Sequence, residues 1–169
     1  MDIQFKREFR EAIEGGRKDV TRRPIPPTIT RGGREYHRRG VERNPHTGRW
    51  EAHYLAEYRE DSGMRVSETL VVPCRYDVPT LRPRYGPRFS PEYGAPLEVV
   101  SVRPETLREI TDEDAKREAI GALGYSETFS GFVQLWFDMY ARAKPWACGL
   151  DSLVWRVEFR RRGGGGGGE

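Results

Sequence analysis

Two adjacent glycines, Gly15 and Gly16, separate a helical pattern from a β-strand pattern near the start of the sequence. The residues before them, 5–13, are amphipathic, and a glycine pair ends a helix because its backbone readily adopts positive φ. The residues after them, 19–23, are too few and too β-branched to extend a helix, and they predict a strand. We therefore expect a helix over residues 8–14 that is followed at once by this strand.

The predicted strand carries several chemically useful side chains. Because side chains alternate between the two faces of a strand, Asp19, Thr21 and Arg23 should point the same way. Lys18 stands just before the strand and is long enough to reach that side, which predicts a positively charged pocket for an anion or a base. A second interpretation needs no ligand, since basic residues after the C-terminus of a helix complement the helix dipole.

Alternating or continuous apolar residues predict further strands along the chain. They cover residues 3–5, 50–58, 67–74, 97–102 and 153–159. A hairpin turn at 61–63 would join the second and third of these strands.

Two further helices are predicted in the C-terminal half, over residues 111–120 and 126–142. The first has Thr111 as its N-cap with Asp114 three residues later, and the second carries an aromatic stripe that we interpret as a core-facing side. The order of strand, helix, several strands, two helices and strand favours an α+β fold with a small antiparallel sheet or barrel.

The remaining segments predict irregular structure. Prolines follow the strand at 19–23, and residues 28–49 are polar, glycine-rich and basic, so we expect a long loop there. Residues 79–96 contain five prolines and are also expected to be irregular. Residues 163–169, six glycines and a glutamate, predict a flexible tail. The chain is thus expected to be one domain, 1–162, with a basic loop insertion at about 24–50.

Charge is distributed unevenly along this sequence. The net charge is only +3, but residues 22–49 hold eight arginines against Glu35 and Glu42. Arginine favours contacts with phosphates and base edges, so this basic segment, with Arg34, Arg38 and Arg39 within it, indicates a nucleic-acid partner. Hydrophobic residues make up only 36% of the chain, and its 4 Trp, 8 Tyr and 7 Phe predict a small, aromatic core.

Cysteines, histidines and hydropathy narrow the class of protein. Cys74 and Cys148 are isolated, which suits a reducing, cytoplasmic setting. The three histidines do not stand at metal-ligand spacings from them, so no metal is expected. No apolar run is long enough to span a membrane, and we expect a soluble, internal protein.

Three stretches of the sequence resemble the ASCH domain family, a branch of the PUA-like β-barrels. FKREFREAIEGGRKDVTRRP, residues 5–24, is similar to the helix and GxKxxxxR signature of its phage and prophage members. LEVVSVRPETLREITDEDAKREAI, residues 97–120, resembles their strand–loop–helix block. FSGFVQLWFDMY and VWRVEF, within residues 129–159, resemble their LW-containing helix and closing strand. The middle departs from the pattern, because residues 81–85 lack its acidic and tryptophan positions.

The resemblance implies a small, mostly antiparallel barrel of about five to six strands flanked by two to three helices. It also implies RNA or base recognition, no cofactor, and a setting in a bacterial cell or a phage-infected host. One bacterial ASCH family removes the acetyl group from N(4)-acetylcytidine with a lysine, a threonine and a glutamate. Those positions match Lys18, Thr21 and Glu118 here, and Arg23 matches the arginine that ends the motif.

Several functions therefore stay open from the sequence. One is binding of RNA or a modified nucleoside without turnover, with the contacts made by Arg17, Arg22, Arg23, Arg34, Arg38 and Arg39. Another is amidohydrolysis by Lys18, Thr21 and Glu118, and a third is a phage accessory role in binding a protein. A ribonuclease role would need an acid and a base that the spacing does not single out. Lys18 and Glu118 would equally suit a structural ion pair, with Thr21 an ordinary strand residue.

Overall fold

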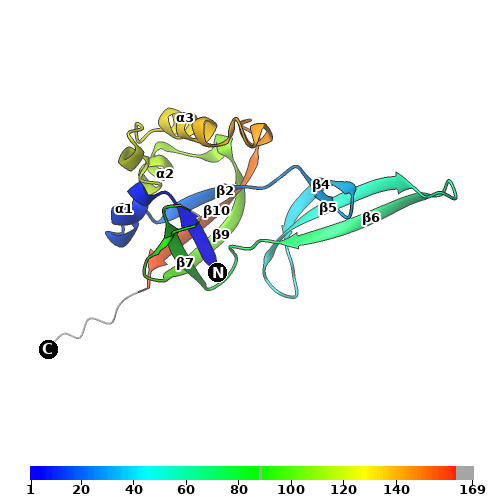
Figure 1. Ribbon diagram of the computed structural model, residues 1–169, viewed down its shortest axis with the longest axis horizontal. Helices are drawn as coiled ribbons and strands as arrows, with labels where there is room; N and C mark the ends of the chain where they lie inside the picture. Colours follow the sequence, from blue (N-terminus) through cyan, green and yellow to red (C-terminus); the bar gives the residue numbers. More distant parts are fainter. Residues whose placement is uncertain (88, 163–169) are drawn as a thin grey trace.

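The computed structural model describes residues 1–87 and 89–162, which form a compact body and a projecting arm of strands (Figure 1). The body is built on a six-stranded sheet ordered β1-β7-β9-β10-β2, with β8 paired to β7. Its strands are β1 (Asp2–Phe5), β2 (Val20–Pro24), β7 (Thr80–Tyr85), β8 (Glu92–Tyr93), β9 (Leu97–Thr106) and β10 (Leu153–Arg161). β1 runs parallel to β7 and the other pairings are antiparallel, so the class is α+β, as predicted.

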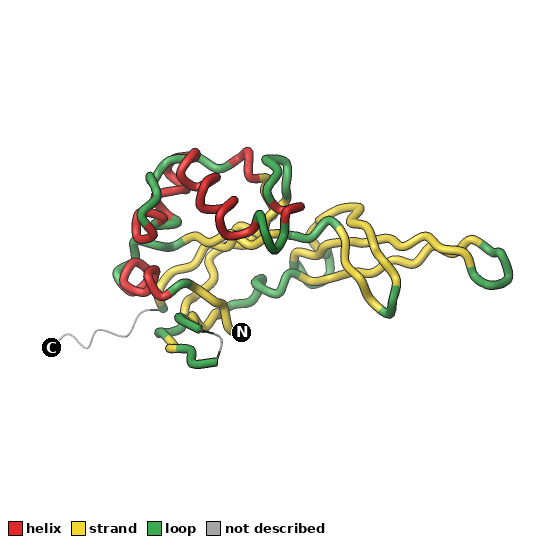
Figure 2. The backbone as a smooth tube through the Cα atoms, turned by 45° about the horizontal axis from the view of Figure 1, so that its top comes forward, coloured by secondary structure: helices red, strands yellow, loops and turns green. Residues whose placement is uncertain are grey.

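The helices gather over one side of this sheet (Figure 2). They are α1 (Arg10–Glu14), α2 (Asp112–Arg117) and α3 (Phe129–Tyr140), with short 3-10 turns between elements. α2 begins with the predicted capping box of Thr111 and Asp114. α3 begins later than predicted, because the Thr128 side chain, which accepts a hydrogen bond from the Gly131 backbone N–H, is the N-cap in place of Ser126.

The long basic loop predicted for residues 28–49 is wrong over residues 28–43, whereas residues 44–49 do form a loop. Residues 28–43 contain β3 (Thr28–Arg31) and β4 (Arg34–Arg43), which join β5 (Trp50–Arg59) and β6 (Arg65–Pro73) in a four-stranded antiparallel sheet. Gly32 and Gly33, at φ of 57° and 76°, make a tight hairpin turn of the kind that two positive-φ residues favour. The polar composition hid this pattern, since these strands bury little and depend on cross-strand pairing with β5 for their order.

The expectation of irregular structure over residues 79–96 is also wrong in part. β7 lies in this segment and pairs with β1 on one side and β9 on the other. Its Leu81 and Tyr85 are fully buried, and Pro83 stands in a parallel register opposite Ile3. Pairing with strands that are distant in the sequence thus accommodated Pro83, which locally predicts a loop.

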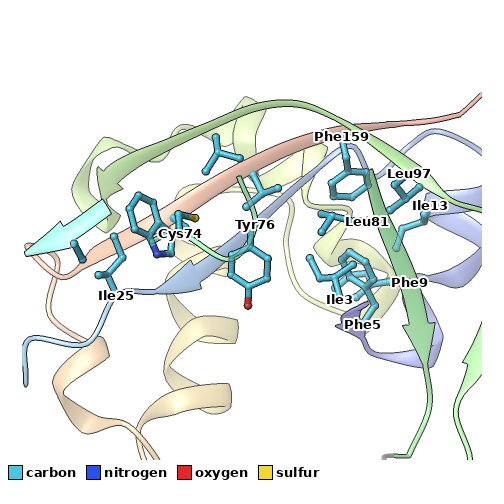
Figure 3. Packing of buried hydrophobic residues seen from close by; sticks show 14 of the residues in the cluster. Ile3, Phe5, Phe9, Ile13, Ile25, Cys74, Tyr76, Leu81, Leu97 and Phe159 are labelled. Carbon is cyan, nitrogen blue, oxygen red and sulfur yellow. The ribbon is translucent and has the colours of Figure 1, made fainter. Parts of the chain in front are cut away.

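The arm is joined to the body through a shared core. Ile25, Tyr54 and Tyr76 belong to the same buried cluster as Phe5 and Phe159 of the body sheet. Figure 3 shows Tyr76 between the side of this cluster that holds Ile25 and the side that holds Phe5. A second cluster packs α2 and α3 against the body and includes Phe132 and Trp136, so the predicted core role of the α3 stripe is confirmed.

The body sheet has an unpaired gap between its two outer strands, β1 and β2. In the described residues no backbone ladder joins them, and the sheet is open there. A side chain spans the gap instead, because Arg23 Nη2 on β2 donates to the Gln4 carbonyl oxygen on β1 at 2.7 Å. This gap faces α3, and the main cavity of the body lies at it.

Candidate functional site

A cavity of about 340 Å³ lies where β1 and β2 face α3, and we call it the inner pocket. Most of its polar lining comes from the segment that the glycine pair precedes and from the end of α2. From these two places come Lys18, Thr21, Arg22, Arg23 and Glu118, and the remaining polar lining residues are Gln4, Lys6 and Lys144. Its apolar walls are mainly aromatic and come from α3 and the first helical turn: Phe9, Phe132, Trp136 and Tyr140. The structure therefore brings Lys18, Thr21 and Glu118 to one cavity.

Lys18 is buried at the floor of this pocket and is fully hydrogen-bonded. Its Nζ donates to Glu118 Oε2 at 2.5 Å, to the Glu118 carbonyl oxygen at 2.8 Å and to the Val20 carbonyl oxygen at 3.0 Å. It also lies 4.4 Å from the centre of the Phe9 ring. Burial lowers the pKa of Lys18 from its usual value, although the Glu118 carboxylate opposes the shift.

Arg22 extends the Lys18–Glu118 pair into a larger buried cluster of charges. Its Nε donates to Glu105 at 2.5 Å, its Nη1 donates to Glu118 at 3.2 Å, and its Nη2 lies 3.1 Å from Asp114. Arg156 on β10 donates to the same Asp114 oxygen at 3.0 Å. We call these residues the ion cluster: Lys18, Arg22, Asp114, Glu105, Glu118 and Arg156. It contains three positive and three negative groups and is therefore charge-balanced.

Within the ion cluster, the pKa of Arg22 and the pKa of Asp114 are shifted in opposite directions. Burial lowers the pKa of Arg22, but Glu118 and Glu105 outweigh it and the net pKa is raised. Burial raises the pKa of Asp114, but the Arg22 guanidinium and the Thr111 backbone N–H outweigh it and hold that pKa well below its usual range. Both groups are thus held in their charged forms.

Thr21 and Arg23 form the other polar side of the inner pocket. Arg23 Nη1 donates to Thr21 Oγ1 at 2.6 Å, as expected for residues on one face of a strand. Asp19 was predicted to share this face, but it lies outside the pocket, where it accepts hydrogen bonds from Arg117 at 2.9 and 3.1 Å. In the described residues no hydrogen bond joins Lys18 to Thr21, because the three Lys18 protons are taken by other oxygens.

The arginines predicted to bind nucleic acid do not come together. Arg22 is buried in the ion cluster, and Arg17 is exposed in the turn before β2. Arg38 donates to the carbonyl oxygen of Ile25 at 2.6 Å and so holds the base of the arm.

The other two predicted arginines lie on the arm and face acidic partners. Arg34 donates to Glu68 at 3.3 Å and stacks on Tyr58, while Arg39 lies 3.8 Å from Glu57. The four-stranded sheet brings a glutamate of β6 to Arg34 and a glutamate of β5 to Arg39, so both arginines are paired with acidic side chains. Of the six predicted arginines, only Arg22 and Arg23 line the inner pocket.

The sequence analysis did not predict most of the residues that surround Lys18, Thr21 and Glu118. Glu105 and Arg156 stand at buried positions of β9 and β10. For Arg156 the available signal was a charge between the apolar neighbours Trp155 and Val157. Phe132 and Trp136 were assigned to the core, and they do pack there, but each also lines the inner pocket.

A second cavity, of about 330 Å³, lies between the body and the base of the arm, and we call it the arm pocket. Arg23, Tyr140 and Lys144 line both cavities, so the two adjoin. Its other walls include Tyr54, Tyr76 and Trp155, together with Arg75.

Comparisons with known proteins found no match to this chain. No protein-family model, curated protein or solved structure matches the chain. In residues 1–87 and 89–162 no three His, Cys, Asp or Glu side chains are arranged to hold a metal ion. None of the helices in the described part of the chain is both long and apolar enough to cross a membrane. The functional interpretation therefore depends on the geometry of the inner pocket.

Proposed function

We propose that the protein binds a base, as a modified nucleoside or as part of RNA, in the inner pocket. The observation that carries this proposal is an aromatic-walled cavity with a polar floor of fixed charge. Its volume of about 340 Å³ falls within the range of small-molecule sites, and its walls offer Phe132, Trp136 and Tyr140. Aromatic walls suit a base because every base has a flat π-face that can stack.

The polar floor offers both acceptors and donors for the edge of a base. Each Glu118 oxygen accepts one hydrogen bond from Lys18 or Arg22 and keeps a lone pair for another. A carboxylate is a suitable acceptor for an exocyclic amino group such as that of cytosine. Thr21 accepts from Arg23 and keeps its own proton to donate. The ion cluster holds these groups in place, so the site is preorganised before a ligand arrives.

The same proposal includes membership in the ASCH branch of the PUA-like folds, with an opened barrel. Supporting it, the three stretches that carry the resemblance form α1, β2, β9, α2, α3 and β10. Of these elements, β2, α3 and the C-terminal end of α2 line the inner pocket, and the arm is an insertion between β2 and β7.

Binding is tested by titration calorimetry with cytidine, N(4)-acetylcytidine, adenosine, uridine and guanosine. Met139→Trp should block the pocket, since Met139 lines it from α3 and takes no part in the ion cluster. Phe137→Trp is the matched control, because Phe137 is on the same helix, is 56% exposed and does not line the pocket. Binding of a nucleoside to wild type and Phe137→Trp, with loss in Met139→Trp, is the expected result. Equal binding by all three proteins, or heat from none of the nucleosides, contradicts the proposal.

A second candidate is hydrolysis of N(4)-acetylcytidine, favoured by the presence of Lys18, Thr21 and Glu118 in one cavity. An oxygen nucleophile would attack the acetyl carbonyl, the amide C–N bond would break, and the exocyclic nitrogen would take up a proton, giving cytidine and acetate after addition of water. Burial lowers the pKa of Lys18, which favours its role as a base, but its protons already bond to Glu118 and Val20. Turnover would thus need Lys18 to change partners, and binding is the better-supported function.

Hydrolysis is measured by chromatographic release of cytidine. Thr21→Val is the useful variant, since it keeps the shape of the side chain and leaves the ion cluster intact. Release by wild type and not by Thr21→Val would establish the enzymatic role. Release by Glu118→Gln at the wild-type rate would remove the acid–base role of Glu118.

A further inference from the structure

The arm pocket and the inner pocket adjoin. Arg23, Tyr140 and Lys144 line both, so these three side chains form the boundary that the two cavities share. The ion cluster lies on the inner-pocket side of this boundary, and Tyr54 of β5 and Trp155 of β10 lie on the arm-pocket side.

Aromatic rings and cations alternate along the arm pocket. Arg75 lies 5.0 Å from the centre of the Tyr76 ring on the arm side, and Lys144 Nζ lies 5.5 Å from the centre of the Tyr140 ring on the α3 side. Arg75 and Lys144 are both exposed. Among the described residues that line this pocket, every charged side chain is basic, the third being Arg23. Glu118, the acidic residue of the inner pocket, is already neutralised by Lys18 and Arg22.

We propose that the two pockets together form a groove for a single-stranded nucleic acid, with one base in the inner pocket and its neighbour in the arm pocket. This inference rests on the proposed function and names its ligand as a strand in place of a free nucleoside. Basic side chains that track a backbone, interleaved with rings on which bases stack, are the features that bind single strands. The phosphate between the two nucleotides lies near the shared residues Arg23 and Lys144, and Arg75 contacts the next phosphate.

The arm provides part of the wall of the second subsite, the arm pocket. It is inserted between β2 and β7, and Ile25 and Tyr76, at its two ends, pack into the body core. The wall that faces the C-terminal end of α3 therefore comes from this insertion and its flanks. Residues of the arm strands line the arm pocket and not the inner pocket, so the second subsite depends on the insertion.

The test compares nucleosides with short strands on the intact protein. Fluorescence anisotropy is measured with labelled tetranucleotides of each single base, in ribo and deoxy forms, and unlabelled nucleosides serve as competitors. Because each stacked base adds about 1–3 kcal/mol, a tetranucleotide should bind at least about fivefold more tightly than its nucleoside. A blunt duplex should compete poorly, because its bases are stacked and paired.

Arg75→Gln is the diagnostic variant, and Arg59→Gln is its matched control. Arg59 is also exposed and also on the arm, but it lines neither pocket of the groove. Arg75→Gln should weaken tetranucleotide binding and reduce its slope against the logarithm of salt concentration by about 0.7, with nucleoside binding unchanged. Arg59→Gln should alter neither.

The outcomes separate this inference from the proposed function. If nucleosides bind but tetranucleotides bind no more tightly, or if Arg75→Gln and Arg59→Gln behave alike, the groove is refuted and the base pocket stands. If neither nucleosides nor tetranucleotides bind, the base pocket itself is refuted and the groove with it. If the duplex binds as tightly as the single strands, the stacking argument is wrong.

Discussion

Replacing Glu118 by glutamine should destabilise the protein more than replacing its partner Lys18. Glu118 is the carboxylate that pairs with Lys18, so Glu118→Gln leaves a buried ammonium without a counter-charge. Removing one member of a buried pair typically costs about 3–5 kcal/mol. In Lys18→Met, by contrast, Glu118 keeps Arg22 at 3.2 Å, and the loss should be nearer about 2 kcal/mol.

The stability of the Glu118→Gln variant should also depend on pH, which tests the same ion pair in a second way. Burial already lowers the pKa of Lys18 in the folded protein, and loss of the Glu118 charge removes the main opposing influence. Between that lowered pKa and the ordinary lysine pKa of about 10.4, the unfolded chain binds more protons than the folded chain, so stability should rise with pH across this range. The slope is at most about 1.4 kcal/mol per pH unit.

Urea unfolding of wild type, both single variants and the double variant, at pH 7 and pH 9, measures these quantities. The double variant should be more stable than the sum of the single effects predicts, by about 1–3 kcal/mol, because it leaves no unpaired lysine charge. For a chain of this size the Glu118→Gln effect corresponds to a fall in Tm of about 6–20 °C. Additive effects, or a Glu118→Gln loss that is the same at both pH values, would refute the view that this pair is a buried ionic contact.

Three further predictions concern the rest of the fold. Of the two free cysteines, Cys148 should react with a thiol reagent in the native state and Cys74 only on unfolding. The reason is that Cys74 is buried, which raises the pKa of its thiol to about 11. The number of thiols modified at pH 8 in the native and unfolded protein tests this. The free energy of unfolding should fall as pH drops below about 4, since the pKa of Asp114 is held low in the folded state only. In urea unfolding at pH 5 and pH 3, Asp114→Asn should lose less stability between the two pH values than wild type does. Gly131→Ala should destabilise α3 by several kcal/mol in the same assay, because its Cβ would overlap the carbonyl oxygen of Ser126; an unchanged midpoint would show that the turn before α3 can move.

The sequence determined most of the local structure of the body. The glycine pair ends α1 and is followed by the short, β-branched β2, the Thr111 capping box begins α2, and apolar residues mark β9 and β10. These features depend on residues close together in the chain, so their physical causes are visible in the sequence. For the same reason, the alternation of side chains along one strand correctly predicted that Thr21 and Arg23 share a face.

Only the tertiary structure decided the arm and the environment of the site. Residues 28–43 form β3 and β4 because β5 lies beside β4 and β4 beside β3, and β5 and β6 also bring the glutamates that pair with Arg34 and Arg39. The sequence held Lys18 and Glu118 as either catalytic groups or an ion pair, and their contact across 100 positions, closed by Arg22, settles the geometry as a buried pair. Contacts between distant segments depend on how deeply each residue is buried and on which segments pack together in the fold. The spacing of residues along the chain does not directly encode these properties.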